Sequence, residues 1–110
     1  MAFTDIEYQA VREEVARFVT EMLSDELDVA FSIEGQTVCL FMVRHEWEGG
    51  QSELTITEQA VAEIRYVRVH NSWQVYWLDA ECGWRLLDVT HTLAAALEMV
   101  REDRHGCFWG

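Results

Sequence analysis

Histidine and cysteine are the side chains in this sequence best suited to bind a metal, and His105 and Cys107 are the closest such pair. Folding could also bring Cys82 and His91 near that pair. A structural zinc site usually takes four cysteine or histidine ligands from closely spaced pairs such as Cys-x-x-Cys. One loosely spaced pair and two lone residues do not meet that pattern. The sequence therefore predicts neither a metal site nor another cofactor.

Nucleophilic catalysis requires a serine or cysteine that is activated by a nearby base. None of the serines lies in a Gly-x-Ser-x-Gly turn, and no histidine is placed by its spacing beside a cysteine. Glu46 and Glu48 flank Trp47 and share one side of the chain if it is extended. Twenty acidic residues in a chain of 110 produce such pairs by chance, however. We therefore predict no catalytic residue and no enzymatic activity.

The composition is strongly acidic, with twenty aspartates and glutamates against eight basic residues, all arginine, and a net charge of −12. This charge disfavours direct binding to nucleic acid or to anionic membranes. The excess is greatest in residues 1–58, which hold thirteen acids and three arginines. Two explanations stay open: the acidity serves solubility or salt adaptation, or it forms a surface for a basic partner protein.

The polar segment 44–53 has the composition of a contact loop. It combines His45, three acids and Trp47 with the flexible pair Gly49-Gly50. Binding residues are frequent on exposed loops, and tryptophan serves interfaces as well as cores, so Trp47 either contacts a partner or folds back on the sheet edge. The residues that we expect to bind a partner are Glu13, Glu21, Asp25, Glu46, Trp47 and Glu48.

The cysteines and the N-terminus bear on the compartment. Three cysteines, an odd number, suit a reducing environment in which thiols stay unpaired. Residues 1–7 have no basic region and no apolar signal core. No apolar run approaches the eighteen or so residues of a membrane span. We therefore expect a cytoplasmic protein that does not bind membranes.

A capping box formed by Thr4 and Glu7 predicts the start of the first helix, because each side chain can accept a hydrogen bond from the other residue's backbone amide. Apolar residues then recur with helical spacing between Val11 and Met22. We expect this helix to run from about residue 5 to about residue 23, with one face on the core and one in water.

The middle of the chain has the alternation of β-strands, with polar or glycine-containing turns between them. The predicted strands are residues 29–33, 37–43, 55–69, 73–78 and 84–87. A second helix starts after Thr90 or Thr92 and stops at Gly106. We expect the final Phe108 and Trp109 to dock on the sheet, because burying such rings is worth on the order of 2–3 kcal/mol each.

These elements predict one acidic α+β domain, residues 1–110. Its order is an N-terminal helix, an antiparallel meander sheet of about five strands and a C-terminal helix, with both helices on one sheet face. The rings expected to fill the space between sheet and helices are those of Tyr66, Trp73, Trp77 and Trp84. The residues expected on the opposite, open face are Glu63, Arg65, Gln74 and Tyr76. Such a polar and aromatic surface suits a protein partner.

Several short runs occur together in the second half of the chain. They are residues 62–66, the aromatic strand Trp73–Trp77, Gly83-Trp84, a short helix and the closing Gly106–Gly110. In this combination, residues 37–110 resemble a bacterial family known as domain of unknown function 3024. The chain lacks the proline and the extra basic residues usual in that family around the loop and last helix. The resemblance implies a shared fold and no activity.

Three functional hypotheses are compatible with these features. The first is a small, acidic, non-catalytic protein-interaction or regulatory module that acts through its N-terminal half and the loop around Trp47 on a partner with a basic surface. The second is a nucleic-acid-mimicking inhibitor, which requires the acids of the first helix and the loop to form one negative stripe. The third is a small-ligand binder or enzyme that uses the aromatic sheet. The sequence gives no indication of the oligomeric state.

Overall fold

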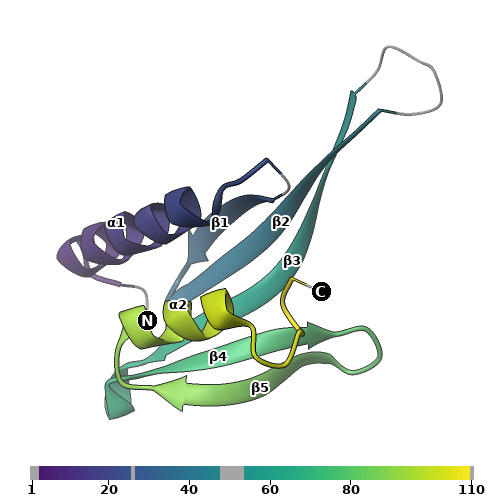
Figure 1. The fold of residues 1–110 in the computed structure, drawn as a ribbon. Coiled ribbons are helices and arrows are strands. Elements are labelled where there is room, and N and C mark those ends of the chain that lie inside the picture. Colours follow the sequence, from purple (N-terminus) through teal and green to yellow (C-terminus); the bar gives the residue numbers. More distant parts are fainter. Residues whose placement is uncertain (1–2, 26, 48–53, 110) are drawn as a thin grey trace.

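The computed structural model describes residues 3–25, 27–47 (for Trp47, the backbone) and 54–109, and it has a helix layer packed on a sheet layer (Figure 1). Helix α1 (Asp5–Met22) comes first and helix α2 (Leu93–Glu102) comes last. The strands are β1 (Asp28–Glu34), β2 (Thr37–Trp47), β3 (Leu54–Val67), β4 (Ser72–Asp79) and β5 (Gly83–Thr90), with the 3-10 turn η1 (Arg68–His70) between β3 and β4.

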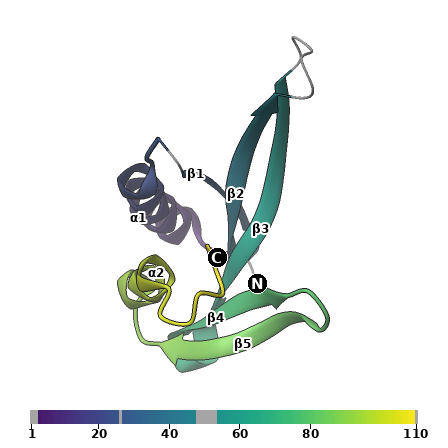
Figure 2. The same ribbon diagram turned by 45° about the vertical axis from the view of Figure 1, so that its right-hand side comes forward.

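The sheet confirms the predicted meander. Its strand order is β1-β2-β3-β4-β5, and each neighbouring pair is antiparallel. The sheet bends strongly, and both helices lie on one face of it, in the angle between the β1–β3 part and the β4–β5 part (Figure 2). Within the described residues, the helices therefore cover one face of the sheet and leave the other, the helix-free face, without a helix.

Helix α1 forms as its sequence predicts. Glu7 donates its backbone N–H to the Thr4 hydroxyl over 3.2 Å, and the Glu7 carboxylate accepts the Thr4 backbone N–H over 2.9 Å, which completes the capping box. The helix buries Val11, Val15 and Phe18. It ends one residue before the predicted end, because Leu23 has extended backbone angles.

The core lies between the helices and the concave face of the sheet. Its largest fully buried side chains come from both layers and are those of Val15, Val38, Leu40, Ile64, Val75 and Val100. Helix α2 also buries Leu93, Ala96 and Leu97, which recur with helical spacing. This packing of amphipathic helices on one sheet face provides the apolar burial that stabilises the fold.

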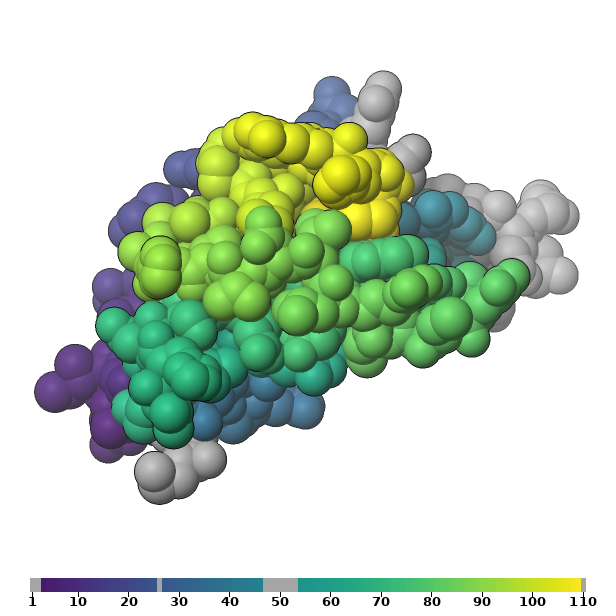
Figure 3. Space-filling model, turned by 90° about the horizontal axis from the view of Figure 1, so that it is seen from below, coloured from purple at the N-terminus to yellow at the C-terminus, as the bar shows by residue number. Residues whose placement is uncertain are grey.

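The C-terminal segment departs from its prediction at one point. Helix α2 ends at Glu102 rather than near Gly106, because Asp103 adopts the left-handed conformation with φ 44°. The Asp103 carboxylate accepts the backbone N–H groups of Phe108 and Trp109, each over 3.1 Å. Phe108 is buried in the core, so the tail docks as expected, and Figure 3 shows the yellow C-terminal residues packed against α2.

Strand lengths also differ from the sequence prediction. Residues 44–47, expected in a loop, belong to β2 because they pair with residues 54–57 of β3, and this pairing outweighs their polar composition. Strand β5 is longer than predicted and ends at Thr90, whereas β3 ends at Val67, where η1 begins. The remainder of the predicted loop, residues 48–53, lies outside the described residues.

A β-bulge explains why Val61 is buried, although regular alternation from Glu63 predicts it on the open face. Leu40 pairs with Ala62 and Phe41 pairs with Ala60, so Val61 is an extra residue without a partner in β2. Its side chain is only 4% exposed and joins the core. The bulge shifts the alternation of β3, so residues 54–60 follow a different parity from residues 62–66.

Neither helix within the described residues combines the length and the apolar content needed to cross a membrane.

Candidate functional site

The helix-free face of the sheet carries most of the large apolar side chains that the strands expose. Paired residues of neighbouring strands share a face, so Leu86 lies beside Tyr76, and Val89 lies beside Gln74. By alternation along β4, Leu78 lies on this face too. Leu78, Leu86 and Val89 are 39%, 51% and 47% exposed. A group of exposed apolar residues on adjacent strands is a common feature of protein-interaction sites.

The centre of the helix-free face is a polar and aromatic network, as the sequence predicts. The Arg65 guanidinium lies 3.9 Å from the centroid of the Tyr76 ring. Its Nε donates to Glu63 over 2.9 Å, and the Tyr76 hydroxyl donates to the Gln74 side-chain oxygen over 2.9 Å. These contacts hold four half-buried side chains in fixed positions, which lowers the entropy cost of binding a partner there.

Three acidic residues of β1 and β3 lie on the same face of the sheet as this network. Asp28 of β1 and Glu58 of β3 both pair with Val43 of β2. Likewise, Glu34 of β1 and Arg65 of β3 both pair with Thr37 of β2. The pairing places the three acids on the helix-free face. His45 lies on the same face and contacts the Asp28 carboxylate over 3.1 Å. The apolar residues of β4 and β5 and the acids of β1–β3 thus share one side of the sheet.

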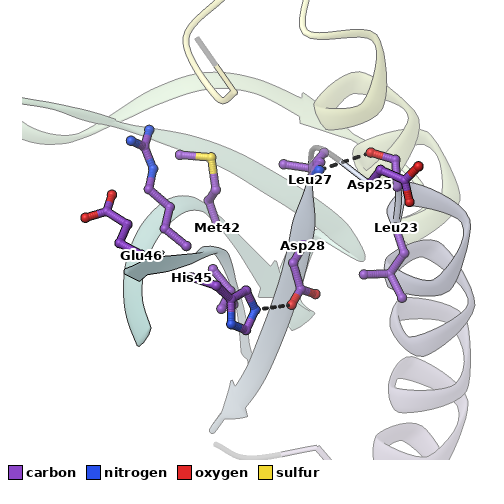
Figure 4. Close-up of a pocket in the computed structure, with 10 residues that line it drawn as sticks. Leu23, Asp25, Leu27, Asp28, Met42, His45 and Glu46 are labelled. Carbon is purple, nitrogen blue, oxygen red and sulfur yellow. Dashed lines mark hydrogen bonds and ion pairs between the residues drawn. The ribbon is translucent and has the colours of Figure 1, made fainter. Parts of the chain in front are cut away.

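Among the described residues predicted to bind a partner, the structure brings Asp25 and Glu46 to one cavity and places Glu13 and Glu21 on α1. Glu13 is exposed on α1, and Glu21 accepts a hydrogen bond from Arg101 of α2 over 2.6 Å. Asp25 and Glu46 line one cavity (Figure 4). Trp47 ends β2, and its side chain lies outside the described part, as does Glu48. Because Arg101 neutralises the charge of Glu21, this glutamate is less able than the other acids to attract a basic partner.

The cavity that Asp25 and Glu46 share has a volume of about 880 Å³ and lies between the connection from α1 to β1 and the far part of β2. Leu23, Leu27 and Met42 give it apolar walls. Figure 4 shows Glu46 and Asp25 on opposite sides of the opening, with Met42 between them. The cavity can therefore accept an apolar group that has positive charges on either side of it.

The aromatic residues divide between the two faces. Trp73 is buried, Tyr66 packs on it with ring centroids 4.8 Å apart, and Trp77 packs against the core. Trp84 was expected in the same core but pairs with Leu78 instead, which puts it on the helix-free face. After the register shift between Val75 and Tyr76, the even-numbered residues Leu86 and Trp84 of β5 lie on the helix-free face. Alternation along β4 predicts Leu78 on the side of Tyr76, whereas sequence reasoning did not identify Leu86 and Val89 as residues of this face.

The three thiols are unpaired. Cys82 is exposed in the turn between β4 and β5, whereas Cys39 and Cys107 are half-buried, and no disulfide joins them. Burial, with Glu63 and Glu34 nearby, raises the pKa of Cys39 to about 11. Burial also raises the pKa of Cys107. In the part of the chain that the structure describes, no three histidine, cysteine or acidic side chains gather closely enough to hold a metal ion.

Comparison with known proteins gives a family and no individual relative. No curated protein and no solved structure matches the chain. The family model described as domain of unknown function (DUF3024) matches residues 2–110, which include both helices and the whole sheet. The match extends beyond the second half of the chain, where the aromatic strand and the terminal Phe-Trp-Gly carry the resemblance. The chain therefore belongs to the DUF3024 family.

Proposed function

We propose that this protein is a small, non-catalytic, cytoplasmic interaction module that binds a partner protein with a basic surface. The single observation that carries the proposal is the helix-free face of the sheet. It combines exposed Leu78, Leu86 and Val89 with the ordered Arg65–Tyr76 pair. Tyrosine and arginine are enriched among the residues that dominate binding energy at interfaces, and apolar neighbours exclude water around them.

The negative charge of the chain indicates which surface charge the partner carries. Asp28, Glu34 and Glu58 lie on the helix-free face, and the chain as a whole has a net charge of −12. These acids attract a basic partner surface, which speeds association and orients the partner, whereas they repel an acidic surface. The apolar group on β4 and β5 then supplies affinity that salt does not screen. The partner is therefore expected to present apolar side chains beside lysines or arginines.

The cytoplasmic assignment rests on the cysteines. Cys39, Cys82 and Cys107 are all unpaired, and Cys82 is exposed. An exposed free thiol is compatible with a reducing compartment and is easily oxidised outside one.

The helix-free face supports this function better than it supports nucleic-acid mimicry. A mimic presents regularly spaced negative charges, whereas this face is apolar at β4 and β5. In addition, Glu21, one of the acids that mimicry requires, is paired with Arg101. We therefore place the partner contact on the sheet face rather than along α1.

Site-specific photocrosslinking in cells tests the proposal. The photoreactive residue benzoylphenylalanine replaces Leu86 or Val89 on the helix-free face, or Ile6 or Val69 as controls that are 84% and 89% exposed elsewhere. We expect a discrete adduct with a basic partner protein from the first two positions and none from the controls. Equal adducts at the four positions, no adduct at Leu86 and Val89, or adducts formed only with a second copy of the chain would overturn the proposal.

The adduct also identifies a partner for measurement in solution. Leu86→Glu is expected to weaken binding of the purified partner by at least about tenfold, since it removes apolar contact and adds a buried charge. Ile6→Glu adds the same charge at an exposed position away from the face and is expected to leave binding unchanged. High salt is expected to slow association with the wild-type chain. Equal loss in both variants would mean that net charge, not the face, governs binding.

A further inference from the structure

Strand β2 extends past its neighbour on one side. Asp28, the first residue of β1, pairs with Val43, so β1 stops there. Residues 44–47 of β2 continue and pair with residues 57–54 of β3. Figure 1 shows β2 and β3 running beyond β1 as a two-stranded arm. Within the described residues, therefore, no strand lies along the other edge of β2 from Arg44 to Glu46.

An open strand edge has a specific binding capacity. In an antiparallel strand, alternate residues direct their N–H and C=O groups to opposite sides, so part of the backbone between Arg44 and Glu46 points away from β3. Backbone groups of this kind can pair with another extended chain, which is the basis of peptide binding by strand addition. Such pairing supplies affinity through the main chain and leaves specificity to the side chains.

The cavity of about 880 Å³ lies along this open edge. Arg44, His45 and Glu46 line one side of it, and the other side is lined by Leu23, Ser24, Asp25, Leu27 and Asp28. The chain turns away here from β1 toward α1, and Leu27 donates its backbone N–H to the Ser24 hydroxyl over 3.0 Å. The space that a longer β1 would fill is therefore open, and it has a second wall that an added strand can pack against.

The side chains around the cavity specify what the added strand carries. Asp25, Asp28 and Glu46 are acidic, and Arg44 is the one arginine among the described residues of the lining. The His45 imidazole contacts Asp28. Leu23, Leu27 and Met42 offer apolar contact between the acids. An extended segment that alternates basic and apolar side chains complements this lining in both charge and shape.

We propose that an extended basic segment of a partner protein adds to the sheet as a strand along Arg44–Glu46, within this cavity. The proposal rests on the proposed function, because it gives the interaction module a second contact and a binding mode. It involves the acids Asp25 and Glu46, whereas the sheet-face contact involves Leu86 and Val89. The two contacts can therefore be broken separately.

Peptide selection followed by backbone methylation tests strand addition. A displayed library of peptides of about six residues, long enough to span the open edge, is selected on the full chain. We expect enrichment of peptides that alternate basic and apolar residues. The best peptide is then synthesised in two forms, one unmodified and one methylated at alternate backbone nitrogens. Methylation removes donors without removing side chains, so we expect it to weaken binding by at least about tenfold.

Two charge reversals serve as matched variants. Glu46→Lys is expected to weaken the unmodified peptide by about tenfold, whereas Glu81→Lys, an equal change at an exposed position in the turn between β4 and β5, is expected to leave it unchanged. Amide hydrogen exchange is expected to slow at residues 44–46 when the peptide binds. Failure to enrich such peptides, equal binding of the methylated form, or equal loss in both variants would overturn strand addition. Partner adducts at Leu86 would still support the proposed function in that case.

Discussion

The Glu7 carboxylate holds the Arg68 guanidinium through two hydrogen bonds of 3.0 Å each, one from each terminal nitrogen. The two residues lie 61 positions apart, at the start of α1 and in η1. The same carboxylate accepts the Thr4 backbone N–H. These bonds lower the pKa of Glu7 to about 2, with those from Arg68 the largest cause. One charged group therefore links the helix cap to the β3–β4 connection.

Neutralising Glu7 is expected to reduce the acid sensitivity of the fold. A carboxyl whose folded pKa is lowered stabilises the native state above its unfolded pKa of 4.5, and this contribution is lost as the pH falls toward about 2. Glu7→Gln keeps the capping box but removes the charge. We expect the variant to be less stable than wild type at neutral pH and to lose less stability between pH 5 and pH 2, as measured by urea unfolding.

Glu13→Gln is the control for this pH dependence, because Glu13 is exposed on the same helix. It is expected to follow the wild-type curve. If Glu7→Gln and wild type lose stability in parallel below pH 5, the ion pair between α1 and η1 does not stabilise the fold in solution.

Removing the Phe108 ring is expected to destabilise the protein strongly. Phe108 is 4% exposed and belongs to the core cluster, although it lies near the chain end. Phe108→Ala should cost about 3 kcal/mol and lower the melting temperature by roughly 10 °C. Phe108→Leu retains most of the apolar volume and should cost under about 1.5 kcal/mol. Similar thermal melts for wild type and Phe108→Ala would mean that the tail is not packed in solution.

The Asp103 carboxylate is expected to be the main polar contact that orders the tail. It accepts two backbone N–H groups, from Phe108 and Trp109, while its own backbone is left-handed. Asp103→Ala should cost about 2 kcal/mol, because both bonds are lost and alanine disfavours positive φ. Asp103→Asn tolerates that conformation and keeps an acceptor, so it should cost less. Chemical denaturation measures the free energy of unfolding of both variants, and equal losses in the two would contradict this role of the carboxylate.

The helices and the number of strands could be predicted because each depends on local spacing. The period of Val11, Val15 and Phe18 and the capping box at Thr4 identify α1 without any tertiary information. The same holds for the buried stripe of α2. Tyr76 and Arg65 were likewise assigned to the open face from alternation, and the register confirms their shared side.

The parts that sequence reasoning missed depend on pairing between strands. The extra residue Val61 changes the parity of β3, and nothing in the residues themselves marks a bulge there. The polar residues 44–47 become strand only because β3 pairs with them, and their open edge exists only because β1 is shorter. Asp103 ends α2 early because its carboxylate accepts hydrogen bonds from the backbone N–H groups of Phe108 and Trp109. Each depends on contacts distant along the chain or on backbone geometry.

Arg65 and Tyr76 are expected to stabilise each other measurably. The guanidinium lies over the ring at 3.9 Å, on a face open to solvent. A double-mutant cycle with Arg65→Met and Tyr76→Leu should give a coupling free energy of about 0.5–1 kcal/mol. Tyr76→Phe retains the ring and is expected to keep most of this coupling while losing the bond to Gln74. Strictly additive effects in urea unfolding would exclude the stacking interaction.

The three cysteines are expected to react with an aromatic disulfide reagent at clearly different rates. Cys82 is exposed and should form the fast phase, which Cys82→Ser should remove. Burial raises the pKa of Cys39 from 9.0 to about 11, which reduces its thiolate fraction at pH 8 about 100-fold relative to an unshifted thiol. Its reaction should be correspondingly slow and should accelerate with rising pH. In urea the difference should disappear, because unfolding restores the solvation of the thiol. Fast labelling of Cys39 in the native protein would contradict its half-buried position on β2.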